Sequence, residues 1–222
     1  MTLDVSKYAI IMLDFDGVIL ESVSVKTENF RKLFADKTDY VEKIVNFHIQ
    51  NGGMSRFDKF RYIYSEILHE ELTEKQFKSL CDNFAKYVYE GVINSPFVKG
   101  ADKFIDKCYK EKVPLYLVSA TPEDEILRIT KEIGIYDKFN HVYGSPMTKA
   151  DCIMQILQEN NLTNDPKKAL FFGDAINDYK AANKTGISFA GRVPKGNVNI
   201  FDGLDGVVGV ISDFTSLIDQ TK

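Results

Sequence analysis

Four aspartates and one lysine have types and spacings that suit phosphoryl transfer. Asp14 and Asp16 end an apolar run and are followed directly by a glycine, whereas Asp174 and Asp178 follow another apolar run much later in the chain. Carboxylate oxygens are the ligands that Mg²⁺ prefers, and Mg²⁺ can offset the charge of a bound phosphate. The pattern therefore predicts a Mg²⁺ site in which the side chains of Asp14 and Asp174 are ligands.

Asp14 can act as a nucleophile only if its repulsion from a phosphate dianion is offset. At 4 Å and an effective dielectric constant of 20 that repulsion is roughly 8 kcal/mol. Mg²⁺ and Lys149 would supply positive charge, and Ser119 with nearby backbone amides would donate hydrogen bonds to the phosphoryl oxygens. Asp16 can protonate the leaving oxygen and later take a proton from the hydrolytic water. The two carboxylates are thus predicted to have separate roles.

The elements that position these residues follow an α/β pattern. Residues 8–14 form a continuous apolar run that ends at Asp14, which is typical of a strand buried on both faces. After residue 96, helices alternate with further predicted strands at 114–119, 141–143, 169–173, 187–190 and 206–210. This alternation predicts an α/β fold with a Rossmann-like parallel sheet, helices on both faces and a ligand site at the carboxyl ends of the strands. Thr121 is expected to cap the helix that Pro122 begins.

The stretch 21–95 differs because its apolar residues recur at helical spacing and no strand pattern occurs in it. Ser55 is expected to cap a helix that runs through Leu68, and Thr73 begins a capping box. We therefore expect an α/β catalytic core of residues 1–20 and 96–222, with residues 21–95 inserted as an all-helical cap.

Composition excludes several classes of protein. The 222 residues include 28 Lys and Arg against 32 Asp and Glu, a net charge of -4, which gives no general attraction to nucleic acid or to anionic membranes. Three cysteines without a CxxC motif argue against a disulfide scaffold. We expect a cytoplasmic protein, a monomer or weak dimer, whose partner is a small phosphorylated metabolite. The three histidines lack metal-ligand spacing, so surface or hydrogen-bonded roles are expected for them.

Four segments taken in order resemble the motifs of the haloacid dehalogenase superfamily. They are Asp14-Phe15-Asp16-Gly17-Val18, Leu117-Val118-Ser119-Ala120-Thr121, Lys149, and Phe172-Gly173-Asp174-Ala175-Ile176-Asn177-Asp178. The helical insertion is similar to the cap of the subgroup that contains phosphoglycolate phosphatase and β-phosphoglucomutase. The resemblance thus implies a phosphatase with a Rossmann-like core and a helical cap.

The resemblance also implies roles for individual residues. Asp14 would be the nucleophile, and Asp16 the acid/base residue whose main-chain carbonyl also binds Mg²⁺. Asp174 would be a metal ligand, and Asp178 a water-mediated or outer metal partner. Ser119 and Ala120 of the second motif and Lys149 would bind the phosphate. The third motif reads Gly144-Ser145-Pro146-Met147-Thr148-Lys149 instead of the subgroup's Lys-Pro-x-Pro, so Lys149 is assigned by position and charge.

A loop of the insertion, residues 53–58, is similar to the cap loop of β-phosphoglucomutase, which makes Arg56 a candidate to bind a second anionic or polar group of the substrate. The leading prediction is a Mg²⁺-dependent phosphatase that acts through an aspartyl phosphate. A sugar phosphomutase of the β-phosphoglucomutase type is the alternative. A dehalogenase is disfavoured by Asp16, a signalling receiver by the inserted helices, and a silent scaffold by the full set of motif residues.

Overall fold

A computed structural model describes residues 3–218. Its strands form one six-stranded parallel sheet in the order β3-β2-β1-β4-β5-β6. They are β1 (Ile10–Leu13), β2 (Leu115–Pro122), β3 (His141–Ser145), β4 (Ala169–Gly173), β5 (Ser188–Arg192) and β6 (Val207–Ile211). The predicted Rossmann-like α/β class is confirmed.

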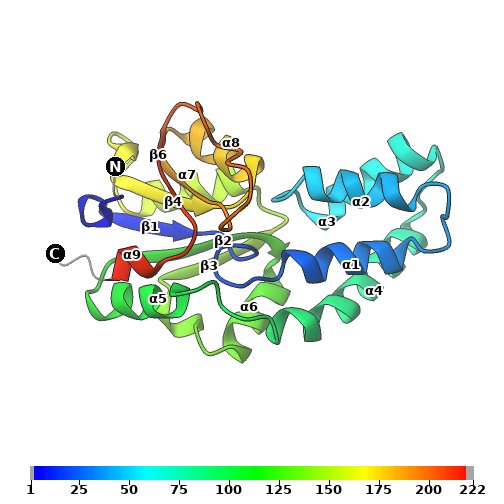
Figure 1. Cartoon of the computed structure of the whole chain (residues 1–222), viewed down its shortest axis with the longest axis horizontal. Helices are drawn as coiled ribbons and strands as arrows, with labels where there is room; N and C mark the ends of the chain where they lie inside the picture. The colour runs from blue at the N-terminus through cyan, green and yellow to red at the C-terminus, as the bar shows by residue number, and fades with distance from the viewer. Residues whose placement is uncertain (1–2, 219–222) are drawn as a thin grey trace.

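Helices cover both faces of this sheet (Figure 1). They are α5 (Ala101–Lys110), α6 (Glu123–Glu132), α7 (Lys149–Glu159), α8 (Ile176–Thr185) and α9 (Thr215–Ile218). In β1, Ile11 and Leu13 pack with residues of α5 and α6, whereas Ile10 and Met12 pack with residues of α7 and α8. Alternate side chains thus enter two apolar layers, which is why this strand reads as a continuous apolar run.

Residues 21–95 lie between β1 and α5 and extend to one side of the sheet (Figure 1). We call them the helical insertion. Their elements are α1 (Val23–Leu33), α2 (Val41–Gln50), α3 (Arg56–Tyr62), the π-helix η2 (Ile63–Leu68) and α4 (Glu74–Ile93). Ser55 and Thr73 cap α3 and α4 as expected. The expected helix from 55 to 68 changes its hydrogen-bond pattern after Tyr62, because η2 follows α3.

The expectation that Thr121 caps a helix is wrong. β2 runs to Pro122, three residues beyond the predicted end of this strand, and Pro122 pairs with Ser145 of β3 past an irregularity in the ladder. The N-cap position of α6 is therefore Pro122, and it has no side-chain cap. Thr121 is left inside the strand end, where its side chain is available to the site.

Candidate active site

The three central strands bring the predicted residues together. β1 lies between β2 and β4, so the residues that follow β1 and β4 and those that end β2 meet at one edge of the sheet. Asp14 follows β1, Thr121 lies near the end of β2, and Asp174 follows β4. Lys149 is the first residue of α7 and reaches the same edge.

A buried ammonium group joins two of the aspartates. The Nζ of Lys149 lies 2.7 Å from Oδ1 of Asp14 and 2.6 Å from Oδ1 of Asp178. All three side chains are buried. Burial raises the pKa of Asp14 to about 7, and the neighbouring carboxylates act in the same direction against the attraction of Lys149. Burial lowers the pKa of Lys149, but the two aspartates outweigh it and hold that pKa above its ordinary value.

Three carboxylates are arranged as a metal site would require. Asp14, Asp174 and Asp178 each offer an oxygen, and these oxygens lie within 4.8 Å of one another. With Lys149 their formal charges sum to -2, from three carboxylates and one ammonium. Burial and the neighbouring carboxylates raise the pKa of Asp174 well above its ordinary value. A hard divalent cation would relieve this excess of negative charge, so the donor set fits Mg²⁺.

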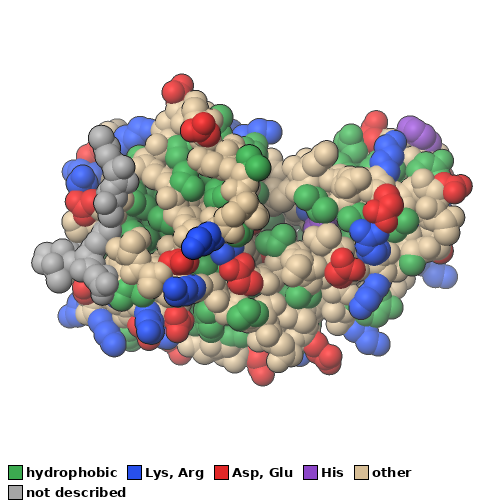
Figure 2. Space-filling model, viewed as in Figure 1, with side chains coloured by type: hydrophobic (Ala, Val, Ile, Leu, Met, Phe, Trp, Pro, Cys, Tyr) green, Lys and Arg blue, Asp and Glu red, His purple; other side chains and the backbone are tan. Residues whose placement is uncertain are grey.

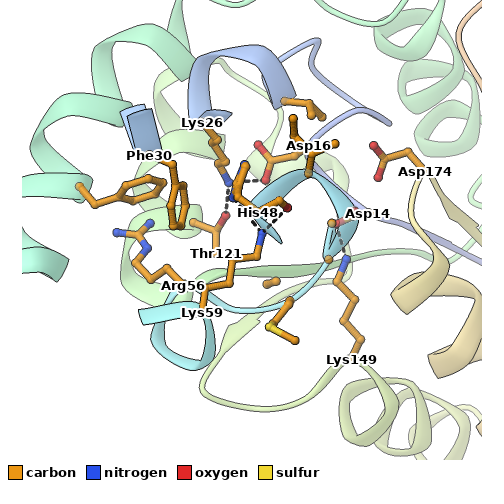
Figure 3. Close-up of a pocket in the computed structure, with 17 residues that line it drawn as sticks. Asp14, Asp16, Lys26, Phe30, His48, Arg56, Lys59, Thr121, Lys149 and Asp174 are labelled. Carbon is orange, nitrogen blue, oxygen red and sulfur yellow. Dashed lines mark hydrogen bonds and ion pairs between the residues drawn. The ribbon is translucent and has the colours of Figure 1, made fainter. Parts of the chain in front are cut away.

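Asp16 points to a different set of partners (Figure 3). Its carboxylate accepts a hydrogen bond from Ser22 Oγ at 2.6 Å and forms an ion pair with Lys26 of α1. The Lys26 ammonium also donates to Oγ1 of Thr121 at 2.9 Å. Burial raises the pKa of Asp16, but Lys26 and Ser22 outweigh burial and lower it overall. The Asp16 side chain is thus separate from the three-carboxylate cluster, and metal binding through its main-chain carbonyl remains a prediction.

The end of β2 contributes both backbone and side chains. Ser119 is buried, and its Oγ accepts a hydrogen bond from the backbone N–H of Thr121 at 3.1 Å. Ala120 and Thr121 line the cavity of the site. The structure therefore brings Ser119 and Ala120 to the predicted edge, where their binding to phosphate stays a prediction.

At this edge, two glycines allow the backbone to approach the carboxylates of Asp174 and Asp178 closely. Gly17 has φ +74°, and a Cβ added to it would lie 2.2 Å from Oδ2 of Asp174. Gly53 has φ +73°, and its Cβ would lie 3.1 Å from Oδ1 of Asp178. The loop before α3 therefore packs directly over the carboxylate cluster, and Asn177 of α8 donates to the carbonyl of Gly52 in that loop at 2.8 Å.

The cavity between the sheet edge and the helical insertion has a volume of about 120 Å³. Carboxylates of the core line one part of it, and Lys26, His48, Arg56 and Lys59 of the insertion line another (Figure 3). Figure 2 shows a notch in the surface between the sheet part and the insertion. The cavity suits a small molecule that meets both parts of the chain.

Arg56 lies in this cavity but already has a partner. Its two terminal nitrogens bind both carboxylate oxygens of Glu125 in α6, at 3.0 and 2.6 Å, and its guanidinium stacks over the ring of Phe84 at 4.8 Å. For Arg56 to bind substrate, as predicted, it would have to exchange Glu125 for the substrate group. In this structure the ion pair joins the insertion to the core.

Sequence reasoning missed four residues of the site, namely Lys26, His48, Lys59 and Thr121. Lys26, His48 and Lys59 lie in helical patterns that are typical of solvated surfaces, so nothing in the local sequence distinguishes them. Thr121 belongs to the second motif, and its place in that motif could have indicated that it lies in the site.

Comparisons with known proteins agree with this geometry. The sequence model of the family described as haloacid dehalogenase-like hydrolase matches residues 8–186. The enolase-phosphatase E1 of Candida tropicalis is 22% identical in an alignment 220 positions long, which covers 86% of this chain and 91% of that protein.

Two solved structures show the same fold over nearly the whole chain. A predicted phosphoglycolate phosphatase from Haemophilus somnus has a TM-score of 0.75 at 20% identity, covering 97% of this chain and 99% of its own. A β-phosphoglucomutase from Clostridium difficile has a TM-score of 0.71 at 18% identity, covering 97% of this chain and 93% of its own.

Proposed function

Because the chain belongs to the haloacid dehalogenase-like hydrolases, we propose that it is a Mg²⁺-dependent phosphatase that hydrolyses a small phosphomonoester through an aspartyl phosphate. One observation carries the proposal. Asp14 directly follows β1 and lies beside Lys149, and its carboxylate oxygen lies within 4.8 Å of the oxygens of Asp174 and Asp178. A nucleophile, a cation and metal-binding oxygens thus share one edge of the sheet.

The residues divide the reaction into two steps. In the first, a carboxylate oxygen of Asp14 forms a bond to phosphorus, the bond from phosphorus to the ester oxygen breaks, and Asp16 gives its proton to that oxygen. In the second, water attacks phosphorus and gives a proton to Asp16, while the bond from phosphorus to Asp14 breaks. Phosphate leaves and both carboxyl groups return to their starting states.

Asp16 must gain a proton before the first step. In the substrate-free protein Lys26 and Ser22 lower its pKa, which suits its later role as a base. A dianionic phosphoryl group beside it acts in the opposite direction, because like charge favours the neutral carboxyl group. Substrate binding would therefore prepare Asp16 to act as an acid.

The side chains of Asp14 and Asp174 would hold Mg²⁺, with Asp178 as a direct or water-mediated partner and the Asp16 carbonyl as a ligand implied by resemblance. When bound, the ion supplies positive charge against the phosphoryl oxygens. Lys149, placed between Asp14 and Asp178, would add a second positive charge at the same group. The relatives' names, a phosphatase, a predicted phosphoglycolate phosphatase and a phosphomutase, also support a phosphate ester as the substrate.

Release of inorganic phosphate tests the proposal. We expect the wild-type protein to release phosphate from small phosphate esters with Mg²⁺ and to lose this activity in EDTA. The Asp14→Asn variant should lose at least about a thousandfold in kcat, because the covalent route is removed. Asp202→Asn changes an exposed aspartate and is the matched control. Full activity of Asp14→Asn would contradict the mechanism.

The same assay separates hydrolysis from phosphoryl transfer back to a sugar. A phosphatase releases one phosphate for each substrate consumed. Loss of a sugar phosphate without release of phosphate would instead support the phosphomutase alternative.

A further inference from the structure

Four basic side chains line the cavity, and three of them have carboxylate partners. Lys149 is paired with Asp14 and Asp178, Lys26 with Asp16, and Arg56 with Glu125. The fourth is Lys59 of α3, for which no ion pair is found within the described residues 3–218.

Lys59 is buried, and within residues 3–218 its ammonium group forms hydrogen bonds only with uncharged acceptors. Its Nζ lies 3.0 Å from Nδ1 of His48 and 3.2 Å from the His48 carbonyl oxygen, and the residue is 4% exposed. A buried ammonium without an anion is costly, and the cost falls when an anion binds. An ammonium group has three donors, so the contacts with His48 leave capacity for a ligand.

The environment of His48 and Lys59 determines which of the two side chains donates the hydrogen bond between them. Burial, with the neighbouring Lys59 and Lys26, lowers the pKa of His48 to about 3. The ring is therefore neutral, and its Nδ1 accepts from the Lys59 ammonium, with the ring stacked on Phe30 at 4.1 Å between centroids. Burial and the nearby Lys26 together lower the pKa of Lys59 to about 7, against the weaker attraction of Asp16 and Asp174. An anion between Lys26 and Lys59 would relieve this repulsion.

We infer that Lys59, held by His48, binds a second anionic group of the substrate, a carboxylate or a second phosphate, at the part of the cavity formed by the helical insertion. This inference rests on the proposed function, because Lys149 and the carboxylate cluster would engage the reacting phosphoryl group. It assigns substrate selection to Lys59, since Arg56 is already bound by both oxygens of Glu125. The substrate class is therefore a small phosphomonoester with a second anionic group.

Steady-state kinetics on matched esters test the inference. Phosphoglycolate supplies a carboxylate, fructose 1,6-bisphosphate supplies a second phosphate, and glycerol 3-phosphate carries neither. We expect the wild-type protein to have a higher kcat/KM for at least one of the first two than for glycerol 3-phosphate. The ester with the higher kcat/KM shows which anionic group Lys59 binds.

Substitution of Lys59 then tests the residue itself. In Lys59→Met the preference for the favoured substrate over glycerol 3-phosphate should fall about 10- to 100-fold, mainly through KM, because a charge-assisted hydrogen bond is lost. Lys59→Arg keeps the charge and should retain most of the preference. Lys43→Met removes an exposed lysine of α2 and is the matched control.

The outcomes distinguish failure of the inference from failure of the proposed function. Equal kcat/KM for all three esters in the wild-type protein would overturn the inference without any variant, while the phosphatase proposal would stand. An equal loss for all three esters in Lys59→Met would place Lys59 at the reacting group and would also overturn it. If the wild-type protein released phosphate from no ester with Mg²⁺, the proposed function itself would fail.

Discussion

At the scale of single residues, the site is defined by which carboxylates form ion pairs with which lysines. Lys149 is paired with Asp14 and Asp178, while Lys26 is paired with Asp16. The two aspartates of the first motif, only two positions apart, differ in the direction of their pKa shifts, because burial outweighs Lys149 at Asp14 whereas Lys26 and Ser22 outweigh burial at Asp16. Different environments for two carboxylates are what a nucleophile and a separate acid/base residue require.

Gly17 provides a prediction at this scale. Gly17→Ala should lower Mg²⁺-dependent turnover at least about tenfold, because the new Cβ would lie 2.2 Å from Asp174 Oδ2 and displace that carboxylate. Stability should also fall by about 1–2 kcal/mol or more, since φ is +74°. Activity assays and urea denaturation measure the two effects.

Gly203→Ala is the control for backbone strain. Gly203 has φ +72°, and nothing lies within 4 Å of its added Cβ. It should lose a similar amount of stability but keep turnover. Equal loss of turnover in both variants would show that strain, and not displacement of Asp174, is responsible.

At the scale of elements, the helical insertion contacts the core through polar side chains. The Lys26 to Thr121 and Asn177 to Gly52 hydrogen bonds and the Arg56 to Glu125 ion pair all cross between the two parts. The segments that connect the parts run together, since Leu20 bridges Phe97 in antiparallel fashion. We expect these linkers, near residues 21 and 95, to permit opening and closing of the insertion over the site.

The Arg56 to Glu125 pair supports a prediction about this motion. Glu125→Gln should lower stability by about 1–3 kcal/mol, because buried Arg56 loses a charged acceptor, although partial exposure of Glu125 reduces the effect. It should also speed hydrogen exchange in α3 and at the two linkers. Urea denaturation and exchange by mass spectrometry measure these changes.

Glu132→Gln, at an exposed position of the same helix α6, is the control. Exchange at the linkers that is unchanged in Glu125→Gln would argue that the ion pair does not hold the insertion closed.

At the scale of the whole molecule, charge is distributed unevenly between surface and site. Figure 2 shows acidic and basic side chains intermingled over one face, whereas the site gathers buried and half-buried carboxylates. No helix among the described residues is long and apolar enough to cross a membrane. The excess of acid that matters for function is therefore local and concentrated at the sheet edge.

Metal binding should stabilise the whole chain. At Mg²⁺ concentrations about a hundredfold above Kd, the gain is about 2.7 kcal/mol. That corresponds to a rise in Tm of roughly 5–10 °C for a chain of this size. Thermal denaturation with Mg²⁺ and with EDTA measures the difference. Asp174→Asn should lose most of the shift and Asp202→Asn should keep it, so an undiminished shift in Asp174→Asn would place the ion elsewhere.

The sequence by itself determined the α/β class, the order of the strands along the chain and the order of the motif residues. Apolar runs, helical periodicity and glycines act over short distances along the chain, so β1, β4 and the caps at Ser55 and Thr73 could be predicted. The carboxyl ends of parallel strands share one edge, and this rule alone brought Asp14 and Asp174 together.

Only the tertiary structure decided which charged groups are paired. Arg56 and Glu125 are 69 residues apart, and Lys26 and Thr121 are 95 apart, so no local pattern links them. Sequence favoured Arg56 as the residue that selects the substrate, whereas packing gives Arg56 a carboxylate and leaves Lys59 beside a neutral histidine. Burial and ion pairing are properties of the packed chain, and they distinguish Lys59 as the buried lysine of the cavity for which no ion pair is found within residues 3–218.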